Sequence, residues 1–281
     1  MNIFKHIILL PVYNDWQSLS KLLHQMNDVF KNYRETETEI LLINDFSIEK
    51  NHIKNEGLSS IKKISIINLN KNVGSQKAIS IGLNYLKKVK QKSIITILDS
   101  DGEDDIKKIP IMFESAKNNE EKVIVSSRTK RQDNVLFKLA YFIHKVFTLL
   151  FTFKWISYGN FSSFNSNQLE KILSNNSSWL AISSCIAKNC EIIKIKAERK
   201  KRLFGISKLS LISLVNHSLR VNAVFLFRVI FLSSIYILIL FYLYLFGFKF
   251  LIIILSLIII FNILLIFTFL TNNQREFYNF E

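Results

Sequence analysis

Apolar and polar residues follow two different rhythms along the first part of this chain. Short apolar runs predict five strands, at residues 7–12, 40–43, 64–67, 94–98 and 123–125. Apolar residues recurring every three or four positions predict amphipathic helices over 16–29, 73–89 and 106–118. Strands that alternate with helices are typical of a mainly parallel sheet covered by helices on both faces, an α/β fold.

The pattern changes after residue 134. Residues 135–155 are strongly apolar, with one polar stripe in which residues recur at intervals of three and four: Lys138, Tyr141, Lys145, Thr148 and Thr152. Such a helix is too polar to span a bilayer, and its lysine stems can extend to the headgroups. We therefore expect it to lie in the plane of a membrane surface, the alternative being a helix packed on the sheet.

Two later stretches are long enough to cross a membrane. Residues 229–248 carry no charge, and 250–271 contain only Asn262 as a strongly polar residue. Each stretch, as a helix, spans the roughly 30 Å of a hydrocarbon core, and the short turn between them predicts a hairpin. We divide the chain into 1–134 and 135–222, two halves of one α/β domain, and 223–281, the hairpin with a short tail.

Charge sets the expected orientation of this hairpin. Lys208, Arg220, Arg228 and Arg275 flank one side of the spans, and Lys249 alone flanks the other. The positive-inside rule then predicts a multi-pass protein of the inner membrane, with the α/β domain and the tail in the cytoplasm.

The net charge of +15 is unevenly distributed. Residues 1–134 carry 21 Lys and Arg against 17 Asp and Glu, whereas 135–281 carry 16 against 5. A basic, acid-poor second half indicates that the protein binds an anionic membrane surface or a phosphorylated substrate. This distribution argues against nucleic-acid binding, because the excess of Lys and Arg lies beside apolar spans and not on a soluble face rich in aromatic residues. Cys185 and Cys190 fit neither a zinc signature nor a disulfide framework.

The strongest chemical signal follows the fourth predicted strand. Asp99 and Asp101 stand at its end, where α/β sheets bind ligands. Crowded carboxylates repel each other, and a hard divalent cation that bridges to a diphosphate would relieve the repulsion. The alternative is an acidic turn that caps the next helix, since Asp104 and Asp105 suit a helix N-terminus.

Several segments in a fixed order give this pair a context. They are Leu-Pro-Val-Tyr-Asn-Asp at 10–15, Ile-Asn-Asp-Phe-Ser at 43–47, Asn-Val-Gly at 72–74 with Ala78 and Gly82, Ser-Ser-Arg at 126–128, and 199–208. With the Asp99–Asp101 pair, they resemble the family 2 glycosyltransferases of GT-A fold over about residues 5–210. The likeness is greatest to the branch of dolichol-phosphate mannose synthase and the bacterial polyprenyl-phosphate glycosyltransferases.

The resemblance implies a role for each matching residue. It assigns nucleotide binding to Pro11, Tyr13, Asp15, Asp45, Gly74, Lys77 and Asp99. It assigns a Mg²⁺ or Mn²⁺ ion to Asp101 and Glu103, and catalysis to Asp99, Asp101, Arg128, Arg199 and Arg202. It assigns the acceptor phosphate to Arg128, Arg202, Ser207 and Lys208. The arginines would neutralise charge on the leaving diphosphate, and the alternative for 199–202 is a basic run facing solvent or lipid.

The chain also departs from the family pattern. Asn44 stands where most members have an aspartate, and Ser162 where many polyprenyl-phosphate transferases have an arginine. A hydroxyl acceptor needs a carboxylate base, and the only candidates in 134–198 are Glu170, Glu191 and Glu198, none in a convincing acidic motif. An acceptor that is already an anion needs no base.

We therefore expect inverting, metal-dependent transfer of a sugar from a nucleotide-diphosphate sugar to a polyprenyl phosphate at the cytoplasmic membrane face. The first alternative is extension of a lipid-linked saccharide, as in O-antigen or capsule synthesis, which the serine at position 162 favours. A catalytically inactive membrane adaptor is a further alternative. The expected partners are the donor, the lipid acceptor and the bilayer, and a homo-oligomer is compatible with all three hypotheses.

Overall fold

The structure is a computed structural model that describes residues 4–33, 36–51, 53, 56–128, 135–205 and 211–272. In this part of the chain one sheet contains β1 (Phe4–Val12), β2 (Thr36–Asn44), β3 (Lys63–Asn68), β4 (Ile94–Ile97), β5 (Lys122–Arg128), β6 (Tyr158–Asn165) and β7 (Glu191–Ala197). The α-helices described are α1 (Trp16–Phe30), α2 (Ser75–Val89), α3 (Ile109–Asn118), α4 (Val135–Thr152), α5 (Leu169–Ile172), α6 (Ile182–Asn189), α7 (Leu211–Ala223), α8 (Leu226–Leu245) and α9 (Leu251–Asn272).

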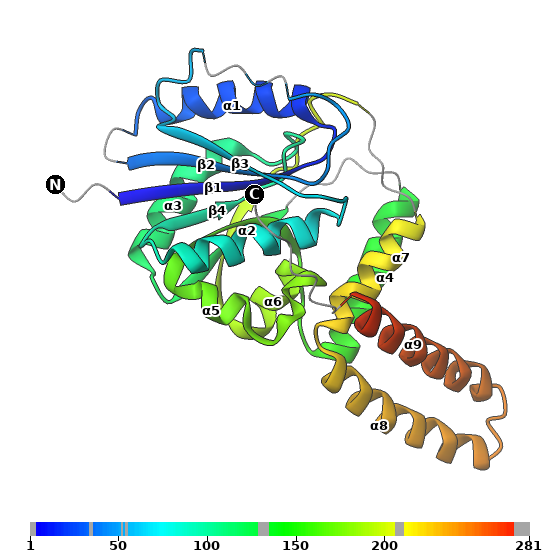
Figure 1. Cartoon of the computed structure of the whole chain (residues 1–281). Coiled ribbons are helices and arrows are strands. Elements are labelled where there is room, and N and C mark those ends of the chain that lie inside the picture. The colour runs from blue at the N-terminus through cyan, green and yellow to red at the C-terminus, as the bar shows by residue number, and fades with distance from the viewer. Residues whose placement is uncertain are drawn as a thin grey trace.

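The sheet is mainly parallel, as predicted. Its strand order is β3-β2-β1-β4-β6-β5-β7, and β6 runs antiparallel to both of its neighbours. Helices cover both faces (Figure 1). Alternate residues of a strand point to opposite faces, so Ile8 and Leu10 of β1 pack with α1 and α3, while Ile7 and Leu9 pack with α2, α5 and α6. The predicted α/β fold class is confirmed.

Two predicted helices begin later than the periodicity indicates. Helix α2 starts at Ser75, because Gly74 adopts a φ of 86° and ends the preceding loop. The segment 106–118 opens with a 3₁₀ turn, Ile106–Lys108, before α3 begins at Ile109.

Strand β6 is one of two strands, with β7, that are not among the five predicted from the hydrophobic pattern. Its residues Ser162 and Ser163 are fully buried between β4 and β5. Both hydroxyls have partners: Ser163 Oγ lies 2.7 Å from Thr96 Oγ1, and Ser162 donates to the carbonyl of Asn160 at 2.9 Å. Because β6 comes from 135–222 yet lies between strands of 1–134, these two parts of the chain share a single sheet.

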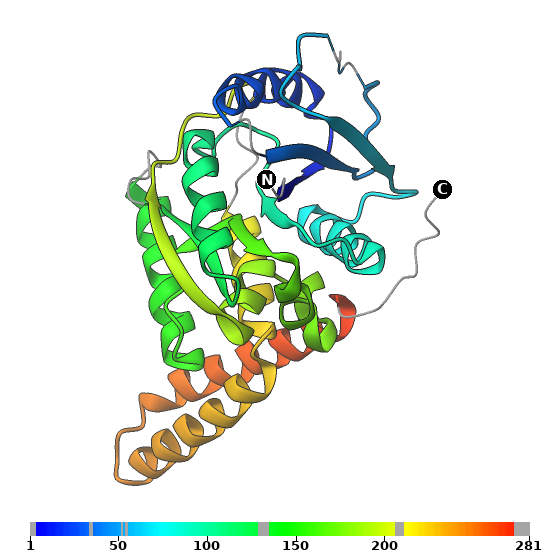
Figure 2. The same cartoon turned by 90° about the vertical axis from the view of Figure 1, so that its left-hand side faces the viewer.

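Helices α8 and α9 form a hairpin that projects from the α/β domain (Figures 1 and 2). Both are long and apolar enough to cross a membrane by length and composition, with mean hydropathies of 2.3 and 3.1. Ser233 of α8 donates a hydrogen bond to Asn262 of α9 at 3.1 Å, so the polar residue of the second span faces the first helix.

Helix α4 packs against α7 and α8, with part of its polar stripe turned inward. Thr148 and Thr152 are buried, and Asn222 of α7 donates to Thr148 Oγ1 at 3.3 Å. Leu139 and Phe142, on the other side of α4, are more than half exposed. An exposed apolar face is compatible with a helix on a membrane surface, which stays a prediction.

Candidate active site

A cleft of about 240 Å³ opens at the carboxyl ends of β1, β2 and β4. It is lined by Pro11, Val12, Tyr13, Asp15, Asp45, Ser75, Asp99, Ser100 and Asp101. Strand β1 pairs with β2 on one side and with β4 on the other, so the strand order reverses direction here. Open α/β sheets bind ligands at such switch points.

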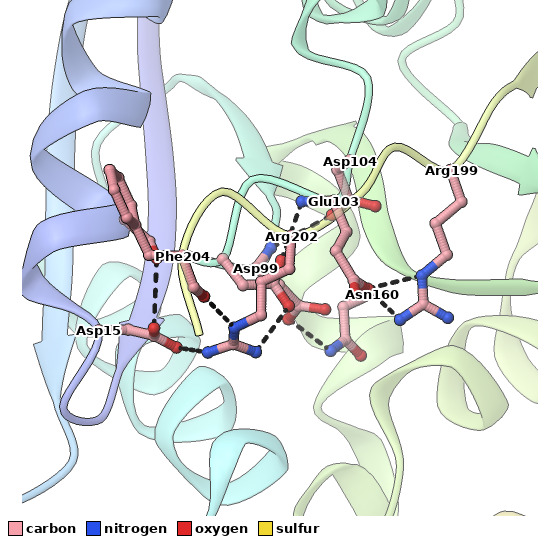
Figure 3. Close-up of polar contacts among 10 residues, drawn as sticks. Asp15, Asp99, Glu103, Asp104, Asn160, Arg199, Arg202 and Phe204 are labelled. Atoms are coloured by element: carbon pink, nitrogen blue, oxygen red, sulfur yellow. Dashed lines mark hydrogen bonds and ion pairs between the residues drawn. The ribbon is translucent and has the colours of Figure 1, made fainter. Parts of the chain in front are cut away.

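The predicted carboxylate pair is part of this cleft. Asp101 accepts a hydrogen bond from the N–H of Glu103 at 3.0 Å, and Asp99 accepts one from the side-chain amide of Asn160 at 3.1 Å (Figure 3). Burial, followed by the negative charge of Asp99, raises the pKa of Asp101, while the Glu103 N–H, Arg202 and Arg199 oppose that rise. The pair therefore favours a ligand that brings positive charge.

The alternative role, an acidic helix cap, has little support. Asp105 occupies the N-cap position of the 3₁₀ turn without a side-chain capping hydrogen bond, and it forms an ion pair with Lys200 at 2.8 Å. Asp104 accepts a hydrogen bond from the N–H of Asp99 at 3.3 Å. These side chains fix the turn that carries the pair.

The donor set fits a divalent cation that is shared with a ligand. Among the described residues, no group of three or more His, Cys, Asp and Glu side chains is arranged to hold a metal ion. Asp99 and Asp101 nevertheless offer hard carboxylate oxygens in one cleft. Such a site matches Mg²⁺ or Mn²⁺ held by one or two carboxylates together with substrate phosphates.

Residues 199–205, here called the strap, lie directly on the turn after Asp101. The N–H of Lys200 donates to the carbonyl of Glu103 at 2.8 Å, and the N–H of Leu203 donates to that of Asp101 at 3.0 Å. Gly102, with a φ of 78°, makes room for the strap, because a Cβ there would lie 2.5 Å from the Leu203 side chain. The structure thus brings the basic segment to the carboxylates, as the sequence predicts.

The strap arginines are paired with carboxylates. Arg202 forms ion pairs with Asp15 and, at 3.4 Å, with Asp101, and it donates to the carbonyl of Phe204 at 2.9 Å (Figure 3). Arg199 donates to Glu103 from Nε at 2.6 Å. Glu103 is not among the residues that line the cleft. Its predicted role as a metal ligand would require release from Arg199 and stays a prediction.

Asp45 has a structural role in addition to the one predicted for it. Only 2% exposed, it accepts hydrogen bonds from the N–H groups of Val73 and Gly74 at 2.7 and 2.8 Å. Burial raises its pKa, and these two N–H groups oppose the rise. Asp45 therefore fixes the turn that precedes α2, and its direct contact with a nucleotide stays a prediction.

Of the other predicted residues, some line the cleft and others do not. Pro11 and Tyr13 line the cleft, whereas Lys77 is half-buried on α2 and is not part of the lining. Arg128 is the last residue of β5. Ser207 and Lys208 lie outside the described residues.

Sequence analysis overlooked two residues, Asn160 of β6 and Gln76 of α2. Asn160 donates to Asp99, and Gln76 donates to Asn160 Oδ1 at 3.0 Å. Both stand close to residues that the family resemblance marks, since Gln76 lies between Gly74 and Lys77 and Asn160 lies two residues before Ser162, but neither was itself assigned a role. Asn160 belongs to the polar strand that the pattern misses, so no signal in the sequence identified its role.

The fold and the cleft define a class of protein: a GT-A-like α/β domain with paired aspartates at the switch point of its sheet. Residues 7–191 match the family model described as glycosyl transferase family 2, and the chain belongs to that family. The predicted family is confirmed.

Curated relatives match part of the chain. The Bacillus subtilis (strain 168) glycosyltransferase YkcC is 30% identical over 135 residues, which cover 48% of this chain and 40% of that protein. The undecaprenyl-phosphate 4-deoxy-4-formamido-L-arabinose transferase of Edwardsiella ictaluri (strain 93-146) is 28% identical over 133 residues, covering 45% and 38%. The match thus spans about two fifths of each relative.

Solved structures agree on the fold. Glucosyl-3-phosphoglycerate synthase from Mycobacterium tuberculosis, in complex with Mn²⁺, UDP and phosphoglyceric acid, superposes with a TM-score of 0.52 at 11% identity. The match covers 80% of this chain and 78% of that one. A mycobacterial protein gives a TM-score of 0.51 at 12% identity, covering 80% and 74%.

Proposed function

We propose that this protein transfers a sugar from a nucleotide-diphosphate sugar to a polyprenyl phosphate at the cytoplasmic face of the inner membrane. The observation that carries the proposal is the cleft lined by Asp99 and Asp101, with Arg202 paired to Asp101 at 3.4 Å, in a domain joined to two apolar helices. A relative whose name describes transfer to undecaprenyl phosphate supports the choice of acceptor.

Asp99 and Asp101 would hold a Mg²⁺ or Mn²⁺ ion, which would neutralise charge that gathers on the leaving diphosphate. Arg202, which pairs with Asp15 and Asp101 of the cleft, would donate to a phosphate oxygen as that charge develops. Pro11 and Tyr13 at the end of β1 would contact the nucleotide base, and the turn that Asp45 fixes would bring the backbone at Gly74 close to the nucleotide.

The positions of three glutamates support an anionic acceptor. Glu170, Glu191 and Glu198 are exposed, and none lines the cleft. Glu170 lies 4.0 Å from Lys87 and Glu191 lies 3.5 Å from Lys122. A phosphate oxygen attacks as a ready-made nucleophile, so the transfer we propose needs none of them as a general base.

The second candidate is extension of a lipid-linked saccharide. Ser162, at the position where many relatives of the polyprenyl-phosphate branch carry arginine, is fully buried in β6 and bonded to its own strand. It therefore supplies no contact to a lipid phosphate, which is the observation that favours this candidate.

One experiment separates the two candidates. A thermal-shift screen against UDP-, GDP- and dTDP-sugars with Mn²⁺ first selects the donor. The purified full-length protein is then given that donor with a radiolabelled sugar, and either undecaprenyl phosphate or a mixture of lipid-linked saccharides as acceptor. Label on undecaprenyl phosphate is the expected result, and label only on the saccharides would favour the second candidate.

A further inference from the structure

An unbroken line of hydrogen bonds leads from the Asp99 carboxylate, which lines the cleft, to the first residue of α6. Asn160 Nδ2 donates to Asp99 Oδ1 at 3.1 Å, and Gln76 Nε2 donates to Asn160 Oδ1 at 3.0 Å. The N–H of Ile182 donates to Gln76 Oε1 at 2.9 Å. We call the two side-chain amides, Asn160 and Gln76, the amide relay.

The chemistry of its two ends fixes the direction of the relay. The backbone N–H of Ile182 can only donate, so it selects the oxygen of Gln76 and turns the NH₂ group of Gln76 toward Asn160. At the other end, Oδ1 of Asp99 accepts, so it pairs with the NH₂ group of Asn160 (Figure 3). Both amides therefore have one orientation that satisfies every partner.

The relay ties Asp99 to three separate elements. Asn160 is on β6, next to β4 in the sheet, Gln76 is in the first turn of α2, and Ile182 is the first residue of α6. Both relay side chains are half-buried. A carboxylate so anchored has fewer orientations to lose when it binds a ligand, which is the usual benefit of a hydrogen-bonded partner behind a metal ligand.

We propose that Asn160 and Gln76 are positioning residues that hold the Asp99 carboxylate toward the cleft and thereby set the affinity for a divalent cation with a nucleoside diphosphate. The inference rests on the proposed function, because it concerns the same cleft. It adds two residues to the donor site and makes α2, β6 and α6 its supports.

The test measures Mn²⁺ binding to the full-length protein by electron paramagnetic resonance, with and without UDP. Asn160→Ala should weaken Mn²⁺ binding about tenfold, the lower end of the effect usual for groups behind a metal ligand. Gln76→Ala should have a smaller effect. The double variant should bind no more weakly than Asn160→Ala, because Gln76 reaches Asp99 only through Asn160.

Asn165→Ala is the matched control, since Asn165 lies on the same strand opposite Ile94, at the other end of β4. Its side chain accepts a hydrogen bond from the N–H of Asn167 at 3.2 Å. This variant should lose thermal stability and keep parental Mn²⁺ affinity. Relay variants that melt at lower temperature but bind Mn²⁺ as the parent does would overturn the inference.

Two further outcomes separate the inference from the function on which it rests. If the parent binds Mn²⁺ under neither condition, both the relay and the proposed metal dependence are wrong. If the parent binds Mn²⁺ with UDP, the relay variants bind it more weakly, and no sugar is transferred to any lipid acceptor, the relay stands and the proposed function falls.

Discussion

At the scale of single residues, carboxylates that line the candidate cleft already form ion pairs with a neighbouring arginine. Arg202 contacts Asp15 and Asp101, two carboxylates that line the cleft from different loops. The Asp101 contact, at 3.4 Å, is a loose one. In the function we propose, Arg202 would exchange it for a phosphate oxygen and keep Asp15, which would place a planar cation beside the leaving group without a large movement.

Substitution of Arg202 should affect turnover far more than donor affinity. Arg202→Ala should lower kcat about 100-fold, the usual loss when a group that stabilises developing charge is removed. Arg202→Lys should recover only part of this loss, because an ammonium lacks the planar fork. Steady-state transfer rates at several donor concentrations give kcat and KM separately.

Lys201→Ala serves as the control, because Lys201 is an exposed basic neighbour on the same strap. It should keep the parental kcat. If the Arg202 variants transfer at the parental rate yet leave the membrane more readily, the strap is only a lipid-facing basic patch.

Sequence analysis can identify a site residue where it directly follows an apolar strand or a glycine. Asp99 and Asp101 stand out because a buried strand runs straight into them, and the structure places both in the cleft. The contacts of Asp45 with Val73 and Gly74 could not be predicted, because they join loops 28 and 29 residues apart. The role of Asn160 was not predicted for the same reason, since its hydrogen-bond partner Asp99 is 61 residues away in the sequence.

At the scale of elements, the sheet positions the cleft through a core that is apolar with a few paired polar groups. His6 of β1 is buried against Phe30 and Phe113, and its Nε2 lies 2.8 Å from Thr96 Oγ1 of β4. Burial lowers the pKa of His6 to about 3 from an ordinary value of 6.5. The imidazole is therefore neutral in the folded protein.

This histidine should make the α/β domain less stable in mild acid. Between pH 6.5 and 3 the unfolded chain binds a proton at His6 that the folded protein does not. The contribution of His6 to the free energy of unfolding is therefore fully present above pH 6.5 and is lost as the pH is lowered. From pH 7 to 5.5 the loss should be about 1 kcal/mol. Melting temperatures at these two pH values, compared between the parent and His6→Gln, isolate the contribution of His6.

The variant should lose less stability on acidification than the parent, although it starts from a lower melting temperature. Equal losses in the two proteins would show that His6 is already protonated in the fold or that it does not titrate on unfolding.

Element prediction succeeded where the chain is apolar and failed where a strand is polar. Strands β1, β2, β4 and β5 were recognised because both of their faces are buried, which gives continuous apolar runs. Strand β6 reads Tyr-Gly-Asn-Phe-Ser-Ser-Phe-Asn, and its buried serines are acceptable because Thr96 of β4 and the backbone of β6 supply partners for their hydroxyls. Those partners belong to the tertiary structure and cannot be inferred from the segment alone.

At the scale of the whole molecule, the cleft belongs to a domain from which two apolar helices project (Figure 2). In the function we propose, these helices would anchor the enzyme in the membrane and so raise its effective concentration near a lipid-bound acceptor. The basic second half of the chain favours the same surface.

Topology can be tested with single cysteines in intact cells. Lys249→Cys, between α8 and α9, should react with a membrane-impermeant maleimide, because the charge asymmetry predicts that this turn lies in the periplasm. Lys50→Cys, exposed in the α/β domain, should react only after the membrane is opened. The parent, with Cys185 buried and Cys190 partly buried, sets the background. Labelling of Lys50→Cys but not of Lys249→Cys in intact cells would reverse the proposed orientation.

The most direct test of the account is Mn²⁺-dependent transfer of a radiolabelled sugar to undecaprenyl phosphate by the parent, Asp101→Ala and Asp105→Ala. Asp105 is the matched control, a carboxylate four residues further on that pairs with Lys200 and is not part of the cleft lining. The account predicts transfer by the parent and by Asp105→Ala, and a loss of at least about 100-fold in Asp101→Ala, since a carboxylate that holds a catalytic cation contributes several kcal/mol. Folded Asp101→Ala that retains more than about a tenth of parental activity would contradict it.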